Sequence, residues 1–386
     1  MKIRNIFITC LWFALASADT LQNSDFELPP TDWNETSSAF FQLNGSSIPG
    51  WTHDGAVQYV TAGGELSLPR NGHAILLQED GKINQTFVAN GEEMQYLLTF
   101  TLGRRAQKNC TANASLVVSA PDSSAQFSLT LKYGKESWEV YGYHLGSWGG
   151  GESVNLVIES QDIDAEPEST CWPVVDAVML STVGSLKQGD DNLLPNGGFE
   201  LGPAFPDFPN DGVLLDSEPS LIESALQQWT VTGTVKYIDA KNFFVPEGKA
   251  AVEIVSGVSA GVQTAKQLDQ GSDYNLEFML GDANDSCSGV LVVGVAAGSS
   301  AQNFTIQSNG TGSAKKYAMT FKGAGPSPTS ISFHSYTTTQ RDDGVFCGPV
   351  VDGVVLKVSS GHKTYMQFSF LMTVLLATVL KLGKLI

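Results

Sequence analysis

The sequence predicts an all-β protein of two tandem jelly-roll β-sandwiches, each with one disulfide bond inside its own domain. Residues 23–28 return as residues 196–201, and residues 171–176 return as residues 347–352, so the two copies lie about 176 residues apart. Long helical periodicity is almost absent, while short alternating or β-branched runs between Gly, Pro, Asn and Ser are frequent. Each copy also carries one pair of cysteines. The repeat therefore indicates two domains of one fold.

The N-terminus is typical of a secretory signal peptide. Lys2 and Arg4 precede an apolar run at residues 6–15, and Ala16 and Ala18 supply the small residues that signal peptidase accepts. We expect residues 1–18 to be removed before Asp19.

The first domain is expected at residues 19–181. Its short apolar or alternating runs predict eight strands, and about eight strands in a domain of this length favour a jelly roll. The strands are expected near residues 56–60, 74–77, 96–102, 114–118, 127–131, 139–144, 154–159 and 174–180.

A linker at residues 182–190 leads to the second domain at residues 191–358. The proline-rich and acidic stretch 203–224 has no counterpart of equal composition in the first copy, so we expect a long surface loop there. The remaining strands are expected near residues 234–238, 250–254, 274–280, 289–295, 302–306, 317–321, 330–335 and 350–358.

The C-terminal residues 359–386 resemble a signal for a glycosylphosphatidylinositol anchor. The small residues Ser359, Ser360 and Gly361 are the attachment candidates, and a polar spacer separates them from an apolar run at 368–380. That run is too short to span a bilayer comfortably as a helix. A secreted protein with an apolar tail and a transmembrane helix are the alternatives.

The cysteines predict the cross-links. Cys10 leaves with the signal peptide, and the four that remain allow three pairings. If the copies fold alike, Cys110–Cys171 and Cys287–Cys347 are equivalent bonds that close loops of 61 and 60 residues. The chain has no Cys-x-x-Cys, so a metal site of closely spaced cysteines is not supported.

The charge restricts the partners. The formal net charge of the 386 residues is −18, and residues 19–361 hold all 40 acidic residues against 17 basic ones, or −23, once both terminal segments are set aside. Nucleic acid, bare anionic membrane and acidic polysaccharide without bridging calcium are poor partners for such a surface. Neutral glycans and basic proteins are compatible with it, and a membrane only through the lipid anchor.

N-glycosylation sequons fit an extracellular protein. They lie at Asn34, Asn44, Asn84, Asn109, Asn113, Asn284, Asn303 and Asn309.

Residues 192–203, 235–238, 245–253, 280–284 and 347–352 resemble a plant cell-wall family known as domain of unknown function 642. The likeness covers the mature chain and is stronger in the second copy. It implies a secreted wall protein with two galactose-binding-like domains, lipid-anchored in some members. It also implies association with cellulose, other wall polysaccharides and pectin methylesterases, and no established catalysis. The first copy departs from the pattern at Ser24, Asp25 and Trp172, and at Arg104-Arg105.

Two short motifs return in both copies: Phe-Glu, which ends at Glu27 and Glu200, and Val-Val-Asp, which ends at Asp176 and Asp352. These motifs also resemble carbohydrate-binding modules of bacterial glycanases, in which the corresponding acids help to hold a structural calcium. That resemblance implies candidate calcium sites at Glu27 with Asp176 and at Glu200 with Asp352. The alternative is that these carboxylates accept hydrogen bonds from local backbone N–H groups without metal.

Sugar recognition favours aromatic rings with amides and carboxylates nearby. Trp51, Tyr59, Trp229 and Tyr237 adjoin strand starts at repeated positions, so core packing is the better interpretation for them. Trp148, in a glycine-rich segment, is a better candidate for an exposed platform. The binding candidates are Trp148, Tyr141, Tyr143, Phe243, Phe244 and Tyr336.

Signs of catalysis are weak. Residues 257–261 satisfy Gly-x-Ser-x-Gly, but no helix pattern follows, and the histidines show no metal-binding spacing. We therefore expect no catalytic residues. The leading hypothesis is a non-catalytic extracellular protein that binds neutral wall polysaccharides or a wall enzyme such as pectin methylesterase. A glycan-modifying hydrolase, with carboxylates paired by folding, and an anchored partner of a cell-surface receptor are the alternatives.

Overall fold

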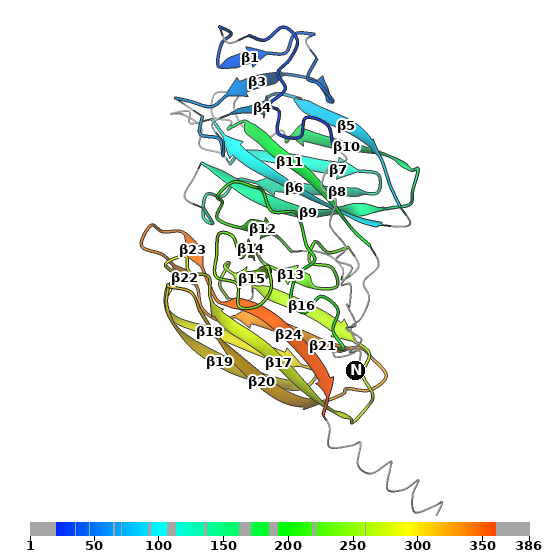
Figure 1. Ribbon diagram of the computed structural model, residues 1–386, viewed down its shortest axis with the longest axis vertical. Helices are drawn as coiled ribbons and strands as arrows, with labels where there is room; N and C mark the ends of the chain where they lie inside the picture. The colour runs from blue at the N-terminus through cyan, green and yellow to red at the C-terminus, as the bar shows by residue number, and fades with distance from the viewer. Residues whose placement is uncertain are drawn as a thin grey trace, which may run out of the picture. The chain divides into compact units, whose positions relative to one another are not determined.

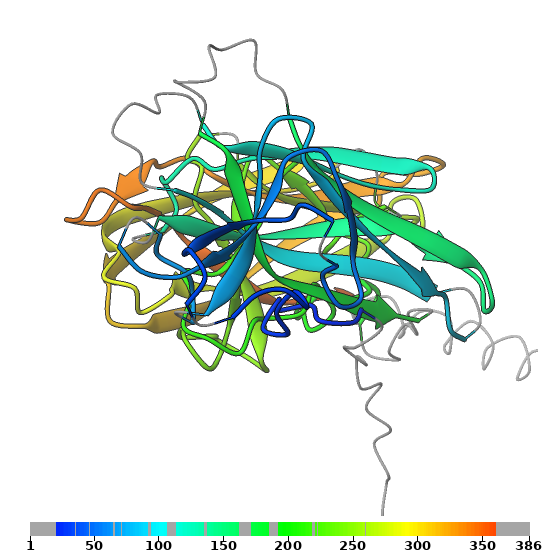
Figure 2. The ribbon, with the colours of Figure 1, turned by 90° about the horizontal axis from the view of Figure 1, so that it is seen from above.

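The structure is a computed structural model that describes residues 21–34, 36–45, 47–64, 66–70, 72–91, 94–105, 113–134, 137–161, 171–184, 192–217, 221, 223–258 and 260–359. Every regular element among these residues is a β-strand, as the coloured ribbons show in two views (Figure 1, Figure 2). The prediction of an all-β fold is confirmed. The described part of the chain also holds no helix of the length and apolarity needed to cross a membrane.

The first eleven strands form two sheets with the orders β1-β3-β4-β11-β6-β9 and β2-β5-β10-β7-β8. Their bounds are β1 (Phe40–Gln42), β2 (Thr52–Asp54), β3 (Val57–Thr61), β4 (His73–Leu77), β5 (Lys82–Val88), β6 (Met94–Arg104), β7 (Ser115–Ala120), β8 (Ser123–Ser128), β9 (Trp138–Trp148), β10 (Ser153–Ser160) and β11 (Pro173–Val183).

The next strands repeat this arrangement, with sheet orders β12-β14-β15-β24-β17-β20 and β13-β16-β21-β18-β19. Their bounds are β12 (Val213–Leu215), β13 (Thr230–Thr232), β14 (Val235–Asp239), β15 (Ala250–Ile254), β16 (Gly261–Lys266), β17 (Asp273–Asp282), β18 (Ser288–Ala297), β19 (Ser300–Asn309), β20 (Ser313–Lys322), β21 (Thr329–Ser335) and β24 (Val350–Val358). A short hairpin of β22 (Thr339–Gln340) and β23 (Phe346–Cys347) is added to this plan.

Strand by strand, the two sandwiches correspond: β5 to β16, β10 to β21, β7 to β18, β8 to β19, and β11 to β24. The tandem jelly-roll prediction is therefore confirmed. The chain forms two compact units in space. The second unit consists of residues 129–143 together with the residues from 186 onward.

Each sandwich has its core between its two sheets. Phe100 of β6 meets Phe127 of β8 edge to face, with ring centroids 5.0 Å apart. In the second copy Phe278 of β17 meets Phe304 of β19 in the same manner at 5.1 Å. These rings are buried by the alternation of the strands, which places every second residue between the sheets.

Of the two expected disulfides, Cys287–Cys347 is present, with a Cα–Cα distance of 5.7 Å. Cys171 is disulfide-bonded as well. Its expected partner, Cys110, lies outside the described residues, so that pairing stays a prediction. Asn109, residues 1–18 and the attachment candidates Ser360 and Gly361 also lie outside the described residues, whereas Ser359 is described at the end of the second sandwich.

Candidate functional site

The repeated Phe-Glu segment is locked into each sandwich by the same hydrogen bond. The Tyr59 hydroxyl donates to the Phe26 carbonyl at 2.8 Å, and the Tyr237 hydroxyl donates to the Phe199 carbonyl at 2.8 Å. Both phenylalanines have positive φ, 54° and 52°, so the segment turns sharply at the same point in each copy. Burial raises the pKa of Tyr237, so the hydroxyl remains a donor at neutral pH. The strongest repeat in the sequence is thus a structural latch.

Trp51 and Trp229 reinforce this latch. The Trp51 Nε1 atom donates to the Asn23 carbonyl at 3.2 Å, and the Trp229 Nε1 atom donates to the Pro195 carbonyl at 3.1 Å. Both side chains are buried, as are Tyr59 and Tyr237. The core interpretation of these four aromatic residues is confirmed.

The first pair of calcium candidates caps backbone donors. Glu27 accepts the His73 backbone N–H at 2.9 Å, and its other oxygen lies 2.9 Å from the His73 Nδ1 atom. Asp176 accepts the Ala177 backbone N–H at 2.6 Å. Burial raises the pKa of Asp176 to about 7, and the Glu27 carboxylate acts in the same direction.

The second pair of calcium candidates, Glu200 and Asp352, also accepts hydrogen bonds from backbone N–H groups. Glu200 accepts the Lys249 backbone N–H at 2.9 Å, while Asp352 accepts those of Glu247 and Gly353 at 2.8 and 2.6 Å. Burial raises the pKa of Asp352 to about 7, with the Glu200 charge as a further cause.

Glycines make room for the two glutamates. A Cβ atom on Gly72 would collide with the Glu27 carboxylate, and one on Gly248 would collide with that of Glu200. Each carboxylate therefore lies directly on the backbone it caps.

Calcium in proteins takes six to eight oxygen ligands. Each candidate pair supplies two carboxylates, whose oxygens already accept the backbone bonds described above. Within the described ranges no group of three or more His, Cys, Asp or Glu side chains is arranged to hold a metal ion. These donors fit the capping role, and a calcium ion would have to draw most of its ligands from water or backbone carbonyls.

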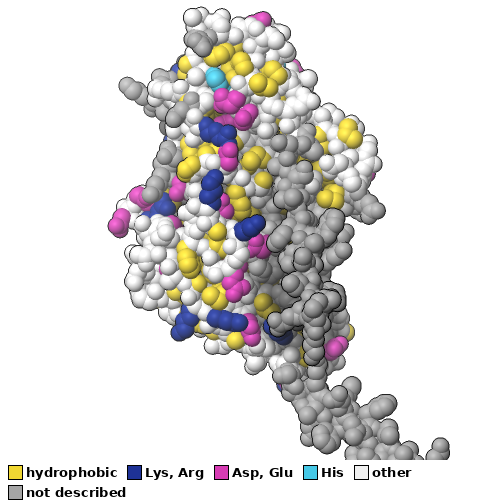
Figure 3. Space-filling view, in the orientation of Figure 1, with side chains coloured by type: hydrophobic (Ala, Val, Ile, Leu, Met, Phe, Trp, Pro, Cys, Tyr) yellow, Lys and Arg dark blue, Asp and Glu magenta, His cyan; other side chains and the backbone are white. Residues whose placement is uncertain are grey.

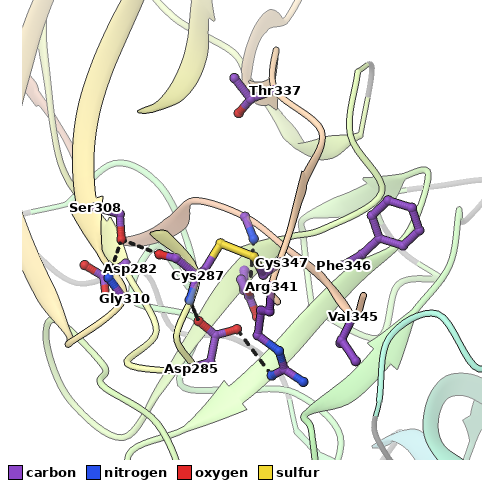
Figure 4. Close-up of a disulfide and its surroundings, with 12 residues drawn as sticks. Asp282, Asp285, Cys287, Ser308, Gly310, Thr337, Arg341, Val345, Phe346 and Cys347 are labelled. Carbon is purple, nitrogen blue, oxygen red and sulfur yellow. Dashed lines mark hydrogen bonds and ion pairs between the residues drawn. A yellow bond between two sulfur atoms is a disulfide. The ribbon is translucent and has the colours of Figure 1, made fainter. Parts of the chain in front are cut away.

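The Cys287–Cys347 disulfide lies beside a charged cluster in the second unit (Figure 4). The backbone N–H of Cys287 donates to Asp285 at 3.1 Å, and the other oxygen of Asp285 lies 3.8 Å from the Arg341 guanidinium. Ser308 donates to the Cys287 carbonyl at 2.5 Å. The disulfide therefore joins segments that are also held by hydrogen bonds and an ion pair.

A second buried pair in this unit consists of Lys236 and Glu253, opposite each other on β14 and β15. Both side chains are 0% exposed, and the Lys236 Nζ atom lies 3.9 Å from the Glu253 Oε2 atom. Glu253 also accepts the Gly348 backbone N–H at 2.9 Å. Burial raises the pKa of Glu253 to about 7, although Lys236 opposes that shift.

Three binding candidates lie on β9. Trp148 is only 8% exposed and packs against Tyr96 and Phe87, with ring centroids 5.5 and 6.2 Å away. The expectation that Trp148 is an exposed platform is therefore wrong. Tyr141 is 3% exposed and its hydroxyl donates to Glu139 at 2.8 Å, while Tyr143 is partly buried.

Phe243 and Phe244 are partly buried in the loop between β14 and β15. Phe243 packs against the buried cluster of Ile238, Ala251, Ala283 and Val350. The backbone N–H of Phe244 donates to the Ala283 carbonyl at 2.9 Å. Phe243 thus supports the loop through its side chain, and Phe244 supports it through its backbone.

Tyr336 differs from the other five candidates, because its side chain is 51% exposed. Its backbone N–H donates to the Val292 carbonyl at 2.8 Å, which holds the residue beside β18. A Cβ atom on Gly294 would come within 2.5–2.8 Å of three atoms of the Tyr336 phenol. The phenol therefore lies over Gly294, in the space a side chain would otherwise fill.

Gly294 belongs to a row of residues on the outer side of one sheet. Gly261, His334, Gly294 and Asn303 are successive partners across β16, β21, β18 and β19. A Cβ atom on Gly261 would come within 2.7 Å of the His334 ring. Two glycines thus leave room for two rings to lie along the sheet.

We call this surface the Tyr336 face: Tyr336 and the outward side chains of β13, β16, β21, β18 and β19. The alternating burial of these strands defines the outward positions. No outward position of the five strands carries Asp, Glu, Lys or Arg. Polar side chains on the face include Gln263, Ser332, His334, Asn303, Thr305 and Gln307.

The corresponding sheet of the first sandwich is different. Its outward positions include Lys82 and Glu159, which are opposite each other, and Asp54, which pairs with Lys82 at 3.1 Å. None of the outward positions in β2, β5, β10, β7 and β8 is aromatic. Residues 162–170, which follow this sheet's strand β10, lie outside the described part of the chain.

The folded chain is thus a tandem β-sandwich protein with repeated structural latches and one uncharged face that bears an aromatic ring. The family described as "Protein of unknown function (DUF642)" matches residues 19–181 and 192–357. The chain belongs to this family, and the resemblance seen in the sequence is confirmed.

Two relatives from Arabidopsis thaliana illustrate the match. One is "Protein DUF642 L-GALACTONO-1,4-LACTONE-RESPONSIVE GENE 2", 30% identical over 375 residues, covering 92% of this chain and 98% of the relative. The other is "Protein TEEBE", 30% identical over 350 residues, covering 88% and 91%.

Among solved structures, the chain is similar to a tandem CBM22 domain from Paenibacillus barcinonensis Xyn10C, with a TM-score of 0.29 and 12% identity over 84% of this chain and all of that one. It is also similar to TmCBM61 in complex with beta-1,4-galactotriose, with a TM-score of 0.26 and 17% identity over 44% and 99%. Ligands do not transfer between proteins at such identities.

Proposed function

We propose that this protein is a non-catalytic extracellular cell-wall protein that binds neutral wall polysaccharides of the cellulose or hemicellulose type through the Tyr336 face. The observation that carries the proposal is the half-exposed phenol of Tyr336, which lies over Gly294 among amide and hydroxyl side chains. Membership in the family also supports an extracellular cell-wall location and a wall polysaccharide as the ligand, because the resemblance implies both.

The chemistry of the face suits a neutral sugar. The axial C–H groups of a pyranose form an apolar surface that packs on an aromatic ring, and hydroxyl groups need donors and acceptors around it. Gln263, Asn303 and Gln307 offer both, because an amide has an N–H₂ donor and a carbonyl acceptor. Because this face has no charged side chain that needs a partner, it can bind a neutral ligand.

The charge of the whole chain favours the same class. With a formal net charge of −18, the protein repels acidic polysaccharides. In the space-filling view, acidic and basic side chains lie next to one another within a mostly uncharged surface (Figure 3). Neutral chains such as cellulose and xylan meet no electrostatic barrier.

A glycan hydrolase is the alternative from another class. Glycoside hydrolysis uses two carboxyl groups that flank the scissile bond. The outward positions of the five strands of the Tyr336 face carry none, and the paired acids Glu27 with Asp176 and Glu200 with Asp352 are engaged with backbone N–H groups. Release of soluble sugars from wall polysaccharides, abolished by changing one acid pair, would favour the enzyme.

A basic wall enzyme such as pectin methylesterase is a second ligand within the proposal, because acidic and basic surfaces attract each other. An anchored partner of a cell-surface receptor is a further alternative that depends on attachment at Ser359, Ser360 or Gly361. Release of the protein from membranes by a phosphatidylinositol-specific phospholipase would support it.

The test is affinity electrophoresis and pull-down of the secreted full-length chain on cellulose, xylan and other neutral wall glycans. Tyr336→Ala should weaken retention roughly three- to tenfold, since an aromatic contact contributes about 0.5–1.5 kcal/mol. Val88→Ala is the matched control, because Val88 is an exposed apolar residue on the corresponding sheet of the first sandwich. Lack of retention on every glycan, together with no binding to a basic methylesterase, would refute the proposal.

A further inference from the structure

A glycosylation sequon lies on the Tyr336 face itself. Asn303, Phe304 and Thr305 form it within β19, where Phe304 points into the core while Asn303 and Thr305 are exposed. β19 is the last strand in the order of its sheet. The acceptor amide is therefore on the outer surface of a strand that has one unpaired edge.

Asn303 is next to the phenol that the proposed function uses. Its partner across the strand pair is Gly294, and the Tyr336 phenol fills the space above Gly294. Residues directly opposite on one face of an antiparallel pair have Cβ positions about 5 Å apart. A sugar attached to the Asn303 amide consequently starts beside the exposed side of Tyr336.

We propose that an N-linked glycan on Asn303 packs its first sugar against Tyr336 and covers the Tyr336 face. The contact is of the kind proposed for a bound polysaccharide, the apolar side of a pyranose against an aromatic ring. The glycan has the advantage of being tethered, so it competes at a high effective concentration against free chains.

The attachment follows the ordinary route for secreted proteins. A preformed oligosaccharide is transferred from a lipid-linked diphosphate donor, and a bond forms between the Asn303 side-chain nitrogen and C1 of the first N-acetylglucosamine. The bond between C1 and the donor phosphate oxygen breaks. The lipid diphosphate leaves, and the amide nitrogen loses one proton.

The consequence is regulation of access, and this part rests on the proposed function. A chain with a glycan on Asn303 has its aromatic platform occupied, and a chain without one offers it to wall polysaccharide. The occupancy of a single sequon would therefore set the fraction of molecules that bind.

The chain supplies matched controls. Asn309 is another exposed sequon on the same strand and the same face, but its cross-strand partner is Ser288 and not a glycine whose open space a ring fills. Asn84 is an outward sequon on β5, opposite Thr52 and Val157. Neither has an aromatic neighbour on its cross-strand partner, so glycans there should be freely accessible.

The first test uses the full chain secreted from a plant cell host, with native treatment by an N-glycosidase and site-by-site mass spectrometry. We expect release at Asn303 to be about tenfold slower than at Asn309, which corresponds to about 1.4 kcal/mol. Tyr336→Ala should bring the two rates together, whereas Tyr336→Phe should keep the protection because it keeps the ring. An unoccupied Asn303, equal rates in the unchanged chain, or protection that survives Tyr336→Ala would overturn the proposal.

The second test is retention on the neutral glycan panel. Asn303→Gln should increase retention severalfold, and Asn84→Gln, on β5 of the first sandwich, should leave it unchanged. Equal retention of the Asn303→Gln and unchanged chains would overturn the regulatory part. If no variant binds any glycan, the proposed function fails, and the protection of the Asn303 glycan by Tyr336 is still decided by the first test.

Discussion

At the scale of single residues, the second unit contains a pair that the first lacks. Lys236 precedes the latch tyrosine Tyr237 and lies opposite Glu253. In the first sandwich, Gln58 precedes Tyr59 and lies opposite Leu76. An ion pair in one copy thus corresponds to an uncharged pair in the other. Removal of two charges from water is unfavourable, so such a pair contributes little net stability, but loss of one partner is severe.

We predict that Lys236→Met lowers the free energy of unfolding by about 3–5 kcal/mol, because the Glu253 carboxylate is left buried without its basic partner. The double change Lys236→Gln with Glu253→Leu copies the first sandwich and should recover most of that loss. Recovery should fall short by about 1 kcal/mol, since the Gly348 N–H loses its acceptor. Denaturant unfolding of the three proteins measures this, and equal losses in the single and double variants would contradict it.

The buried acids make stability depend on pH. Burial raises the pKa of Asp176 to about 7 in the folded chain, against about 3.9 for an unfolded aspartate. Between these values the folded state binds more protons than the unfolded state, so stability falls as pH rises through this window. We predict that the melting temperature of the first sandwich decreases from pH 5 to pH 8, because the free energy of unfolding falls by at most about 1.4 kcal/mol per pH unit for each group.

Asp176→Asn should flatten this dependence, because the amide oxygen still accepts the Ala177 N–H but does not titrate. Glu159→Gln is the control, since Glu159 is an outward residue of β10 and its change should leave the slope as it is. A chelator should not alter the melting temperature if capping is the whole role of these acids. A large decrease with EGTA would instead support a structural calcium at Glu27 and Asp176.

At the scale of elements, the sequence predicts strands well where apolar residues form a continuous or alternating run. The expected bounds 250–254 and 350–358 agree with β15 and β24 as observed. The strands β5 and β16 are not predicted, because the inward residues Gln85 and Thr264 interrupt the apolar alternation that the other strands show. The expected loop 203–224 contains the short strand β12. This segment is a strand because it pairs with β14.

The binding candidates show what sequence reasoning misses. The glycines around Trp148 suggest an exposed ring, but Gly146 has a φ of 154° and a Cβ atom there would collide with that ring. The glycine therefore lets Trp148 fold back into the core. At Tyr336 the glycine with the same effect, Gly294, is on another strand, so only the three-dimensional pairing reveals the platform.

This pairing predicts an effect of Gly294→Ala. The added methyl group would displace the Tyr336 phenol, which is half-exposed and can move outward without disturbing the core. We expect polysaccharide retention to fall to the level of Tyr336→Ala while the melting temperature changes little. Val88→Ala, at an exposed position of β5 in the first sandwich, is again the control. Unchanged retention in Gly294→Ala would show that the ring position is irrelevant to binding.

At the scale of the whole molecule, the repeated segments and the candidate site lie in different places. The phrases that return in sequence build latches and caps in both sandwiches, and these explain the shared fold. The Tyr336 face lies on strands whose counterparts in the first sandwich carry some charged outward residues, such as Lys82 and Glu159. Internal repetition therefore identifies the scaffold, and divergence between the copies identifies the candidate site.

The net charge gives a prediction that separates the two partner classes. Charged surfaces are screened over about 10 Å at 0.1 M salt and about 3 Å at 1 M, so attraction between this acidic chain and a basic wall enzyme should weaken steeply over that range. Stacking of a neutral sugar on Tyr336 involves no net charge and strengthens slightly when salt favours apolar burial. We therefore expect retention on xylan or cellulose to be unchanged or slightly higher at 1 M NaCl, and capture of a basic methylesterase to be lost. Retention on neutral glycan that disappears with salt would mean that charged groups, and not the uncharged face around Tyr336, hold the polysaccharide.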